Sequence, residues 1–156
     1  MNKLKLLTLL GLAFLSNTVQ ANEQQSDIVI ANAWAKGHGA NGAIYMDIHH
    51  NGDDHDVLKG ATCSIARKCE LHTHIKSGDV YQMRKVDSIQ IAANEKTSLE
   101  HGGLHVMLIG LKEPLKPGDN IKVKLNFANA GEIEKNVVVK PIDHNPSDNK
   151  AGCACE

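Results

Sequence analysis

Residues 102–111 read Gly102-Gly103-Leu104-His105-Val106-Met107-Leu108-Ile109-Gly110-Leu111, and our fold prediction starts from this stretch. The paired glycines are typical of a turn, and the apolar run after them has the length of a β-strand. Side chains two apart in a strand point to the same face, so His105 and Met107 are predicted to share one face and Val106 and Leu108 the other. One strand would then present His and Met outward while its second face holds the core.

Similar short runs, rich in β-branched residues or alternating with period two, occur along most of the chain. Turn residues separate them, as at Asn51-Gly52, Ser77-Gly78-Asp79 and Asn129-Ala130-Gly131. Beyond the N-terminal segment no stretch shows a sustained helical period. We therefore predict an all-β antiparallel sandwich with strands at 28–34, 43–49, 57–62, 69–74, 80–86, 97–100, 105–111, 120–128 and 132–140.

The N-terminal 21 residues have the features of a secretory signal peptide. Lys3 and Lys5 precede the mainly apolar stretch 6–15, and Val19-Gln20-Ala21 forms a small-residue cleavage site. The apolar stretch is too short to span a bilayer, and no cysteine lies beside the cleavage site. We expect a periplasmic protein cleaved after Ala21, with no stable membrane insertion and no lipid anchor there. A buried N-terminal helix is the alternative.

The mature chain would have 135 residues, enough for one domain with its own core, which we place at 22–140. It would carry 15 basic and 18 acidic side chains, a balance that argues against a nucleic-acid partner. Residues 141–156 contain two prolines and are mostly polar, which predicts a flexible C-terminal tail.

Two histidines and two methionines follow the spacing His-x10-Met-x21-His-x-Met, at His72, Met83, His105 and Met107. Thioether sulfur favours Cu(I), and imidazole adds a nitrogen ligand, so this neutral set disfavours Mg²⁺, Ca²⁺ and Mn²⁺. The four residues are therefore predicted to be metal ligands. The alternatives are that both methionines fill the core and that His105 caps a turn.

The same spacing resembles that of the PCuAC family of periplasmic copper chaperones, and the similarity extends over about residues 27 to 140. Residues 42–46 resemble an early strand of that family, 70–74 and 102–111 its two ligand segments, and 115–119 the turn that follows. The resemblance implies a cupredoxin-like Greek-key β-sandwich or barrel. It also implies delivery of Cu(I) to the binuclear copper site of cytochrome c oxidase, alone or with Sco-type thiol proteins.

Three residues near the predicted ligands each have alternative roles. His74 lies on the same strand face as His72 and is either a ligand when Met83 moves away, a hydrogen-bonding partner or a solvated strand residue. Glu70 shares that face and either orients an imidazole or is an exposed carboxylate. His101 is expected in a solvated turn, near enough to His105 to line the rim. We also expect solvated positions for His49, His50 and His55, around the Asn51-Gly52 turn, with an accessory metal site as the alternative.

Four cysteines in an exported chain suggest oxidation. Cys63 and Cys69 flank a plausible turn, and a disulfide between them is the preferred pairing, although four cysteines allow three connectivities. A mixed Cys-His zinc site including Cys69 is less favoured, since Cys69 and His72 would face opposite sides of one strand. Cys153 and Cys155, with His144 in the same tail, form a candidate site for a second copper ion or for disulfide exchange with a partner.

The sequence thus predicts a Cu(I) chaperone that passes copper to another protein, such as the copper subunit of an oxidase or a Sco-type thiol protein. A periplasmic copper buffer that confers tolerance is the main alternative, because the ligand chemistry is the same. An electron-transfer cupredoxin is less favoured, since blue-copper sites need a Cys thiolate beside two His. No catalytic triad, carboxylate pair or phosphate-binding glycine loop is found, so we do not expect an enzyme.

Overall fold

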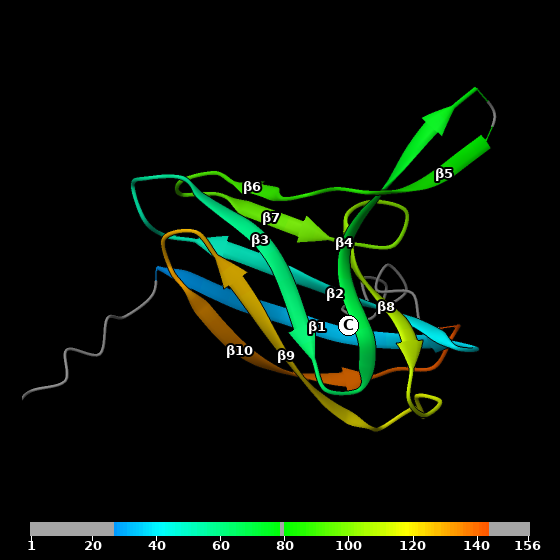
Figure 1. The fold of residues 1–156 in the computed structure, drawn as a ribbon. Helices are drawn as coiled ribbons and strands as arrows, with labels where there is room; N and C mark the ends of the chain where they lie inside the picture. Colours follow the sequence, from blue (N-terminus) through cyan, green and yellow to red (C-terminus); the bar gives the residue numbers. More distant parts are fainter. Residues whose placement is uncertain (1–26, 79, 144–156) are drawn as a thin grey trace, which may run out of the picture.

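The computed structural model describes residues 27–78 and 80–143, and over this part the chain forms ten β-strands (Figure 1). In these residues there is no helix of the length and apolarity needed to cross a membrane. The strands are β1 (Ile28–His38), β2 (Asn41–His50), β3 (Asp56–Cys63), β4 (Ala66–Ser77), β5 (Val80–Lys85), β6 (Ile89–Ile91), β7 (Lys96–Leu99), β8 (His105–Leu111), β9 (Asn120–Phe127) and β10 (Glu132–Val139).

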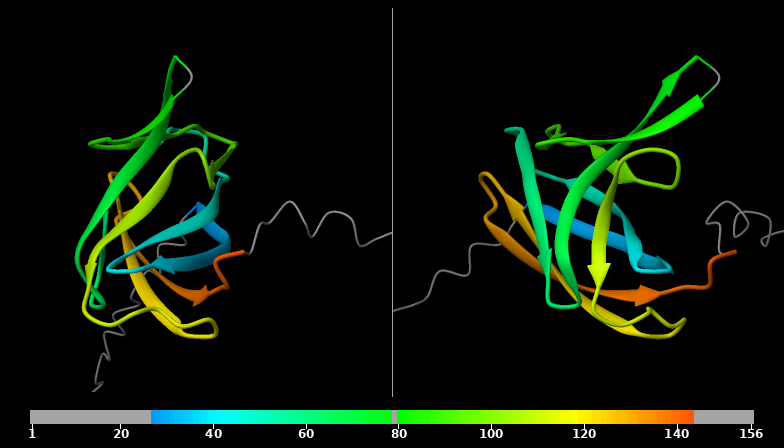
Figure 2. Two further views of the ribbon diagram at one scale, coloured as in Figure 1. Left: turned by 90° about the vertical axis from the view of Figure 1, so that its right-hand side faces the viewer. Right: turned by 45° about the vertical axis from the view of Figure 1, so that its right-hand side comes forward.

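The strands form one hydrogen-bonded order, β5-β4-β8-β2-β1-β10-β9-β3-β6, with β7 also paired to β2. All pairs are antiparallel except β1 with β10. The sheet curls until β3 and β4, far apart in this order, lie side by side (Figures 1 and 2). The predicted all-β sandwich or barrel is confirmed.

The hydrophobic core fills the inside of this curled sheet. Val106 and Leu108 of β8 are fully buried there, and so is Leu71 of the neighbouring β4. The alternation predicted for residues 105–108 is therefore confirmed, with one face of β8 in the core and His105 and Met107 on the other. Strands from the opposite side of the barrel complete the core with Leu58, Ile91, Val123, Leu125 and Val137.

A β-bulge changes which face β1 presents to the core. Asn32 has a φ of 50°, a left-handed conformation that Asn tolerates, and the pairing of β1 with β2 shifts between Ala31 and Trp34. Ile30 before the bulge and Ala35 after it are both in the core. Trp34 is consequently placed on the outer face, and the strand continues to His38, beyond the predicted end at residue 34.

The structure differs from the sequence prediction at two further places. The three-residue strand β6 (Ile89–Ile91) was not predicted, because so short a segment has too little pattern of its own and depends on pairing with β3. His50 is not solvated: it is 7 % exposed, and its Nδ1 lies 3.3 Å from the carbonyl oxygen of Ala92. The segment after β6 covers it, since the His50 amide also donates to the carbonyl of Glu95.

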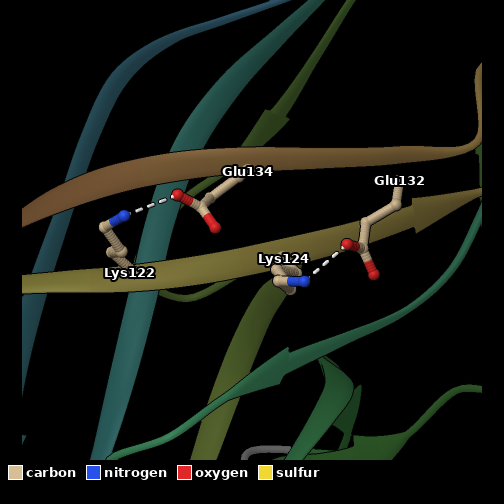
Figure 3. Close-up of polar contacts among 4 residues, drawn as sticks. All are labelled: Lys122, Lys124, Glu132 and Glu134. Carbon is tan, nitrogen blue, oxygen red and sulfur yellow. Dashed lines mark hydrogen bonds and ion pairs between the residues drawn. The ribbon is translucent and has the colours of Figure 1, made fainter.

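The outer surface of the β9–β10 hairpin carries two ion pairs (Figure 3). Lys122 Nζ lies 2.9 Å from Glu134 Oε1, and Lys124 Nζ lies 2.7 Å from Glu132 Oε1. These hydrogen bonds raise the pKa of Lys124 and lower the pKa of Glu134. Because all four side chains are exposed to solvent and salt, the pairs mark the polar face of the hairpin and contribute little to stability.

A buried carboxylate connects the start of β3 to the turn after β9. Asp56 is 2 % exposed and accepts hydrogen bonds from the backbone amides of Val57, Asn129 and Ala130 at 2.6, 2.9 and 2.9 Å. Burial by itself would raise the pKa of this carboxyl group, but the backbone donors outweigh it and lower the pKa. The charged form is therefore the one that the fold stabilises.

We predict that Asp56→Asn lowers the free energy of unfolding by about 1–3 kcal/mol at pH 7, because the amide nitrogen cannot accept the amide hydrogen bonds. The folded-state pKa lies below the unfolded one, so the contribution of Asp56 is present above the unfolded pKa and is lost as pH falls through the folded value. Urea unfolding at pH 7 and below about pH 4 measures this. A stability difference that grows on acidification would contradict the assignment.

Candidate metal centre

The outer faces of β4 and β8 bring three of the four predicted ligands together. The antiparallel register places His72 opposite His105 and Glu70 opposite Met107. The centroids of the two imidazole rings are 6.0 Å apart. Residues more than thirty positions apart in the sequence are thus neighbours on one sheet face, as the alternation of both strands requires.

His105 is held in one tautomer. It is 1 % exposed, and its Nδ1 lies 3.0 Å from the carbonyl oxygen of Gly103. A carbonyl oxygen only accepts, so Nδ1 carries the proton and donates it, which leaves Nε2 with a free lone pair. Burial, followed by the neighbouring His74, His72 and His101, lowers the pKa of His105 against the opposing effect of Gly103. The neutral ring needed by a ligand is therefore favoured.

Capping the turn and binding a metal ion, given above as alternatives for His105, are compatible, since the two roles use different nitrogens of its ring.

His72 has a similar arrangement. Its Nε2 lies 3.1 Å from Glu70 Oε2, and its Nδ1 is buried with no hydrogen-bond partner. The hydrogen bond with His72 is the main cause of the lowered pKa of Glu70. In the neutral ring, Nε2 donates to the carboxylate and Nδ1 keeps its lone pair.

His74 lies closer to His105 than the sequence indicated. β4 runs between β5 and β8, and the register pairs His74 with Met83, so His74 stands between Met83 and His105. The ring centroids of His74 and His105 are 5.2 Å apart, and the Nδ1 of His74 is also buried without a partner. His74 is therefore partly buried beside His105, and its role at this centre stays a prediction.

Met83 occupies a different environment from Met107. It is 44 % exposed on β5, a strand whose described residues are all exposed, in a hairpin that extends away from the body of the barrel (Figure 1). Met107 is partly buried, on the outer face of β8. Neither belongs to the core cluster, so the interpretation of these methionines as core fillers is wrong.

An aromatic pair that sequence reasoning missed borders the histidines. Trp34 and Tyr45 are both 5 % exposed, with ring centroids 4.5 Å apart, and form with Ala43 a small cluster outside the main core. The ring of Tyr45 lies 6.1 Å from that of His105 and 6.3 Å from that of His101. Tyr45 lies in the quoted segment 42–46, but the position of Trp34 depends on the bulge and could not be found from alternation.

The nitrogen and sulfur atoms of the histidines and Met107 fit a soft metal ion better than a hard one. Two buried imidazole nitrogens lack any partner in the protein, and the nearby thioether of Met107 is a soft donor. In the described part of the chain, no three His, Cys, Asp or Glu side chains surround a point that could hold a metal ion. Met107, opposite Glu70 in the register, is the thioether that this face offers beside the imidazoles.

The cysteines lie elsewhere. Cys63 and Cys69 are free thiols with sulfur atoms 2.8 Å apart, so the predicted neighbours are in contact and the disulfide itself remains a prediction. Cys69 packs against the core cluster, on the side of β4 opposite His72. This position argues against the mixed Cys-His site. His144, Cys153 and Cys155, the candidate tail site, lie outside the described residues.

Comparison with known proteins identifies the family. The family model described as "Putative lipoprotein LpqE-like" matches residues 28–139. The chain belongs to the LpqE-like family. This LpqE-like protein is similar to "Putative lipoprotein Lxx21020" of Leifsonia xyli subsp. xyli, with 33 % identity over 139 residues that cover 86 % of this chain and 84 % of the relative.

Solved structures similar to this LpqE-like protein include PCuAC domains and the protein DR1885. The copper-bound PCuAC domain from PmoF2 has a TM-score of 0.63 and 21 % identity, covering 74 % of this chain and 93 % of that domain. The solution structure of CuI-DR1885 from Deinococcus radiodurans has a TM-score of 0.60 and 27 % identity, covering 81 % and 87 %. The cupredoxin-like fold is thereby confirmed.

The two faces of β8 in this LpqE-like protein should respond differently to mutation. We predict that Val106→Asp abolishes cooperative unfolding of the metal-free protein, because it buries an unpaired charge at a fully buried position. Met107→Leu, on the outer face, should cost less than about 1.5 kcal/mol. Thermal unfolding followed by circular dichroism measures both. Equal losses of stability would show that Met107 serves the core.

Proposed function

We propose that this protein is a periplasmic copper chaperone that binds one Cu(I) through His72, Met83, His105 and Met107 and passes it to another protein. The observation that carries the proposal is the pairing of the imidazoles of His72 on β4 and His105 on β8, in which the buried Nδ1 of His72 has no hydrogen-bond partner. The similarity to a structure of DR1885 solved with CuI, at 27 % identity, supports copper as the cargo.

The hydrogen bonds around the histidines prepare them to bind metal. His105 donates from Nδ1 to Gly103, and His72 interacts through Nε2 with Glu70, so the opposite nitrogens are available: Nε2 of His105 and Nδ1 of His72. Partners of this kind fix ring orientation and raise ligand basicity. A neutral set of two imidazoles and two thioethers would favour Cu(I).

Unequal burial of the two methionines supports release as well as binding. Met107 is partly buried on a central strand, whereas Met83 is 44 % exposed at the outer strand of a hairpin. An incoming thiolate from a recipient would replace the exposed thioether first. His74, next to Met83 in the register, is placed to hold the ion while Met83 is displaced. Copper would then move by stepwise ligand exchange.

A copper buffer remains the second candidate function, since the same face would serve it.

The position of the cysteines disfavours an electron-transfer cupredoxin. Blue-copper sites need a thiolate beside two imidazoles, and Cys69 lies on the opposite side of β4 from His72. We therefore propose a binding protein, not a redox carrier or an enzyme.

We further propose that the protein acts after export, with residues 1–21 removed as a signal peptide. The lipoprotein names of its family and of its relative support export. As recipient we propose the copper subunit of an oxidase or a Sco-type thiol protein, and as a second copper site the tail residues His144, Cys153 and Cys155. The soft donor set, which thiolates can displace, is what supports a thiol-bearing recipient.

We predict that the metal-free protein takes up one tight equivalent of Cu(I) in competition with a chromophoric Cu(I) chelator. X-ray absorption should show nitrogen and sulfur neighbours. Met107→Leu should weaken binding by more than about 100-fold and Glu70→Gln, which acts on the site through the His72 imidazole, by about 10–100-fold. Met83→Leu should leave a weaker site that His74 completes.

Two matched controls accompany these variants. Met46→Leu changes a methionine of the core, and His55→Gln changes an exposed histidine remote from the centre, so both should retain the parental Cu(I) affinity. Only nitrogen and oxygen neighbours in the absorption spectrum, or equal effects of Met46→Leu and Met107→Leu, would refute the ligand assignment.

Delivery is tested separately from binding. We predict that the Cu(I) form transfers its copper to the metal-free copper domain of an oxidase subunit, measured by the copper content of that domain after separation. Deleting residues 141–156 should leave the one tight site but remove any second equivalent or slow the transfer. Tight binding without transfer would instead favour the buffer. Unchanged stoichiometry and rate after the deletion would remove the tail from the proposal.

A further inference from the structure

Cys63 and Cys69 meet where the curled sheet is not closed by hydrogen bonds. Cys63 ends β3, Cys69 lies in β4, and the chain turns between them. β3 pairs with β6 and β9, and β4 with β5 and β8, but β3 and β4 do not pair with each other. The two sulfur atoms are 2.8 Å apart, close enough for a disulfide after a small adjustment.

The thiols open onto a groove between these two strands. Its volume is about 570 Å³, and both cysteines line it. Basic side chains outnumber acidic ones along it, with Lys59, Arg67, Lys68 and Lys85 against Glu70 and Asp87. A reagent reaching the sulfur atoms would therefore pass a positively charged lining, which favours an anionic one.

The two sulfur atoms are not equivalent. The thiol of Cys69 hydrogen-bonds to Cys63, and this contact, aided by the backbone amides of Ala66 and Ile65 and by Lys112, lowers the pKa of Cys63 to about 6 against the effect of burial. The same contact, with burial, raises the pKa of Cys69. Two sulfur atoms in contact on the wall of an open groove have the arrangement of an attacking and a resolving cysteine, and the lowered pKa of Cys63 favours it as the attacking thiolate.

We propose that Cys63 and Cys69 form a thiol–disulfide exchange site that takes an anionic disulfide from the groove. The Cys63 thiolate attacks one sulfur of the incoming disulfide, forming a mixed disulfide and releasing one thiolate. Cys69, after losing its proton, attacks Cys63 and releases the second thiolate. The protein dithiol is oxidised by two electrons to a disulfide, and the incoming disulfide is reduced to two thiols.

The two thiols are separate from the proposed metal ligands, although Glu70, which hydrogen-bonds to His72, also lines the groove. Cys69 packs toward the core, and His72 lies on the other face of β4. Exchange at the groove therefore needs no metal ligand, and the copper-binding proposal can fail or succeed without it. The inference differs from a structural bridge, because a structural bridge would be closed permanently and would not react.

The experiment uses the full chain, metal-free, with Cys153→Ser and Cys155→Ser to remove the tail thiols. The reduced protein is mixed with oxidised glutathione and followed by mass spectrometry. We expect an intramolecular disulfide in this parent protein. When Cys69→Ser is added to the parent, a stable glutathione adduct should form. When Cys63→Ser is added instead, the adduct should form at least ten-fold more slowly. Circular dichroism of each variant verifies the fold.

Two further measurements test whether the oxidation is reversible and whether its rate depends on the charge of the incoming disulfide. Excess reduced glutathione should regenerate the dithiol, and the cationic disulfide cystamine should react more slowly than oxidised glutathione. Equal rates for the two single-cysteine variants, no adduct in either, or a bridge that glutathione cannot reduce would overturn the exchange site. Faster reaction with cystamine would overturn the groove as the route of entry. Cu(I) affinity measured in parallel shows whether the metal centre is affected.

Discussion

The antiparallel pairing of β4 with β8 is the interaction on which the rest of this structure depends. In one register it places Leu71 beside Val106 in the core and His72 beside His105 on the outer face. A shift of one residue would exchange the two faces and put imidazoles into the core. The apolar side chains thus fix the register, and the register brings the histidines together.

The outer face is protected from water without being part of the core. Trp34 and Tyr45 cover the sheet next to His105, which is almost fully buried although it faces away from the core. Burial holds the pKa of His105 down, and the Gly103 carbonyl fixes its tautomer. The fold therefore supplies a neutral, oriented nitrogen before any ion arrives, which lowers the cost of binding a soft cation.

Strand β4 carries two different chemistries on its two sides. Glu70, His72 and His74 belong to the outer face, and Cys69 belongs to the side that meets β3. Alternation keeps the thiols away from the imidazoles although they are close in sequence. A thiol within reach of the copper face would compete for the ion. The separation explains how one strand can serve both a soft-metal site and a dithiol.

The sequence by itself determined the β class, nearly all the strands, and the sharing of faces by His105 with Met107 and by His72 with His74, because alternation is a local property of extended chains. It also indicated that Cys63 and Cys69 are neighbours. Only the tertiary structure decided that His74 stands between Met83 and His105, since strand order is not encoded locally. It likewise decided the outward position of Trp34, through a bulge at Asn32 that depends on pairing with β2. The groove at the thiols, too, exists only because the curled sheet leaves β3 and β4 unpaired.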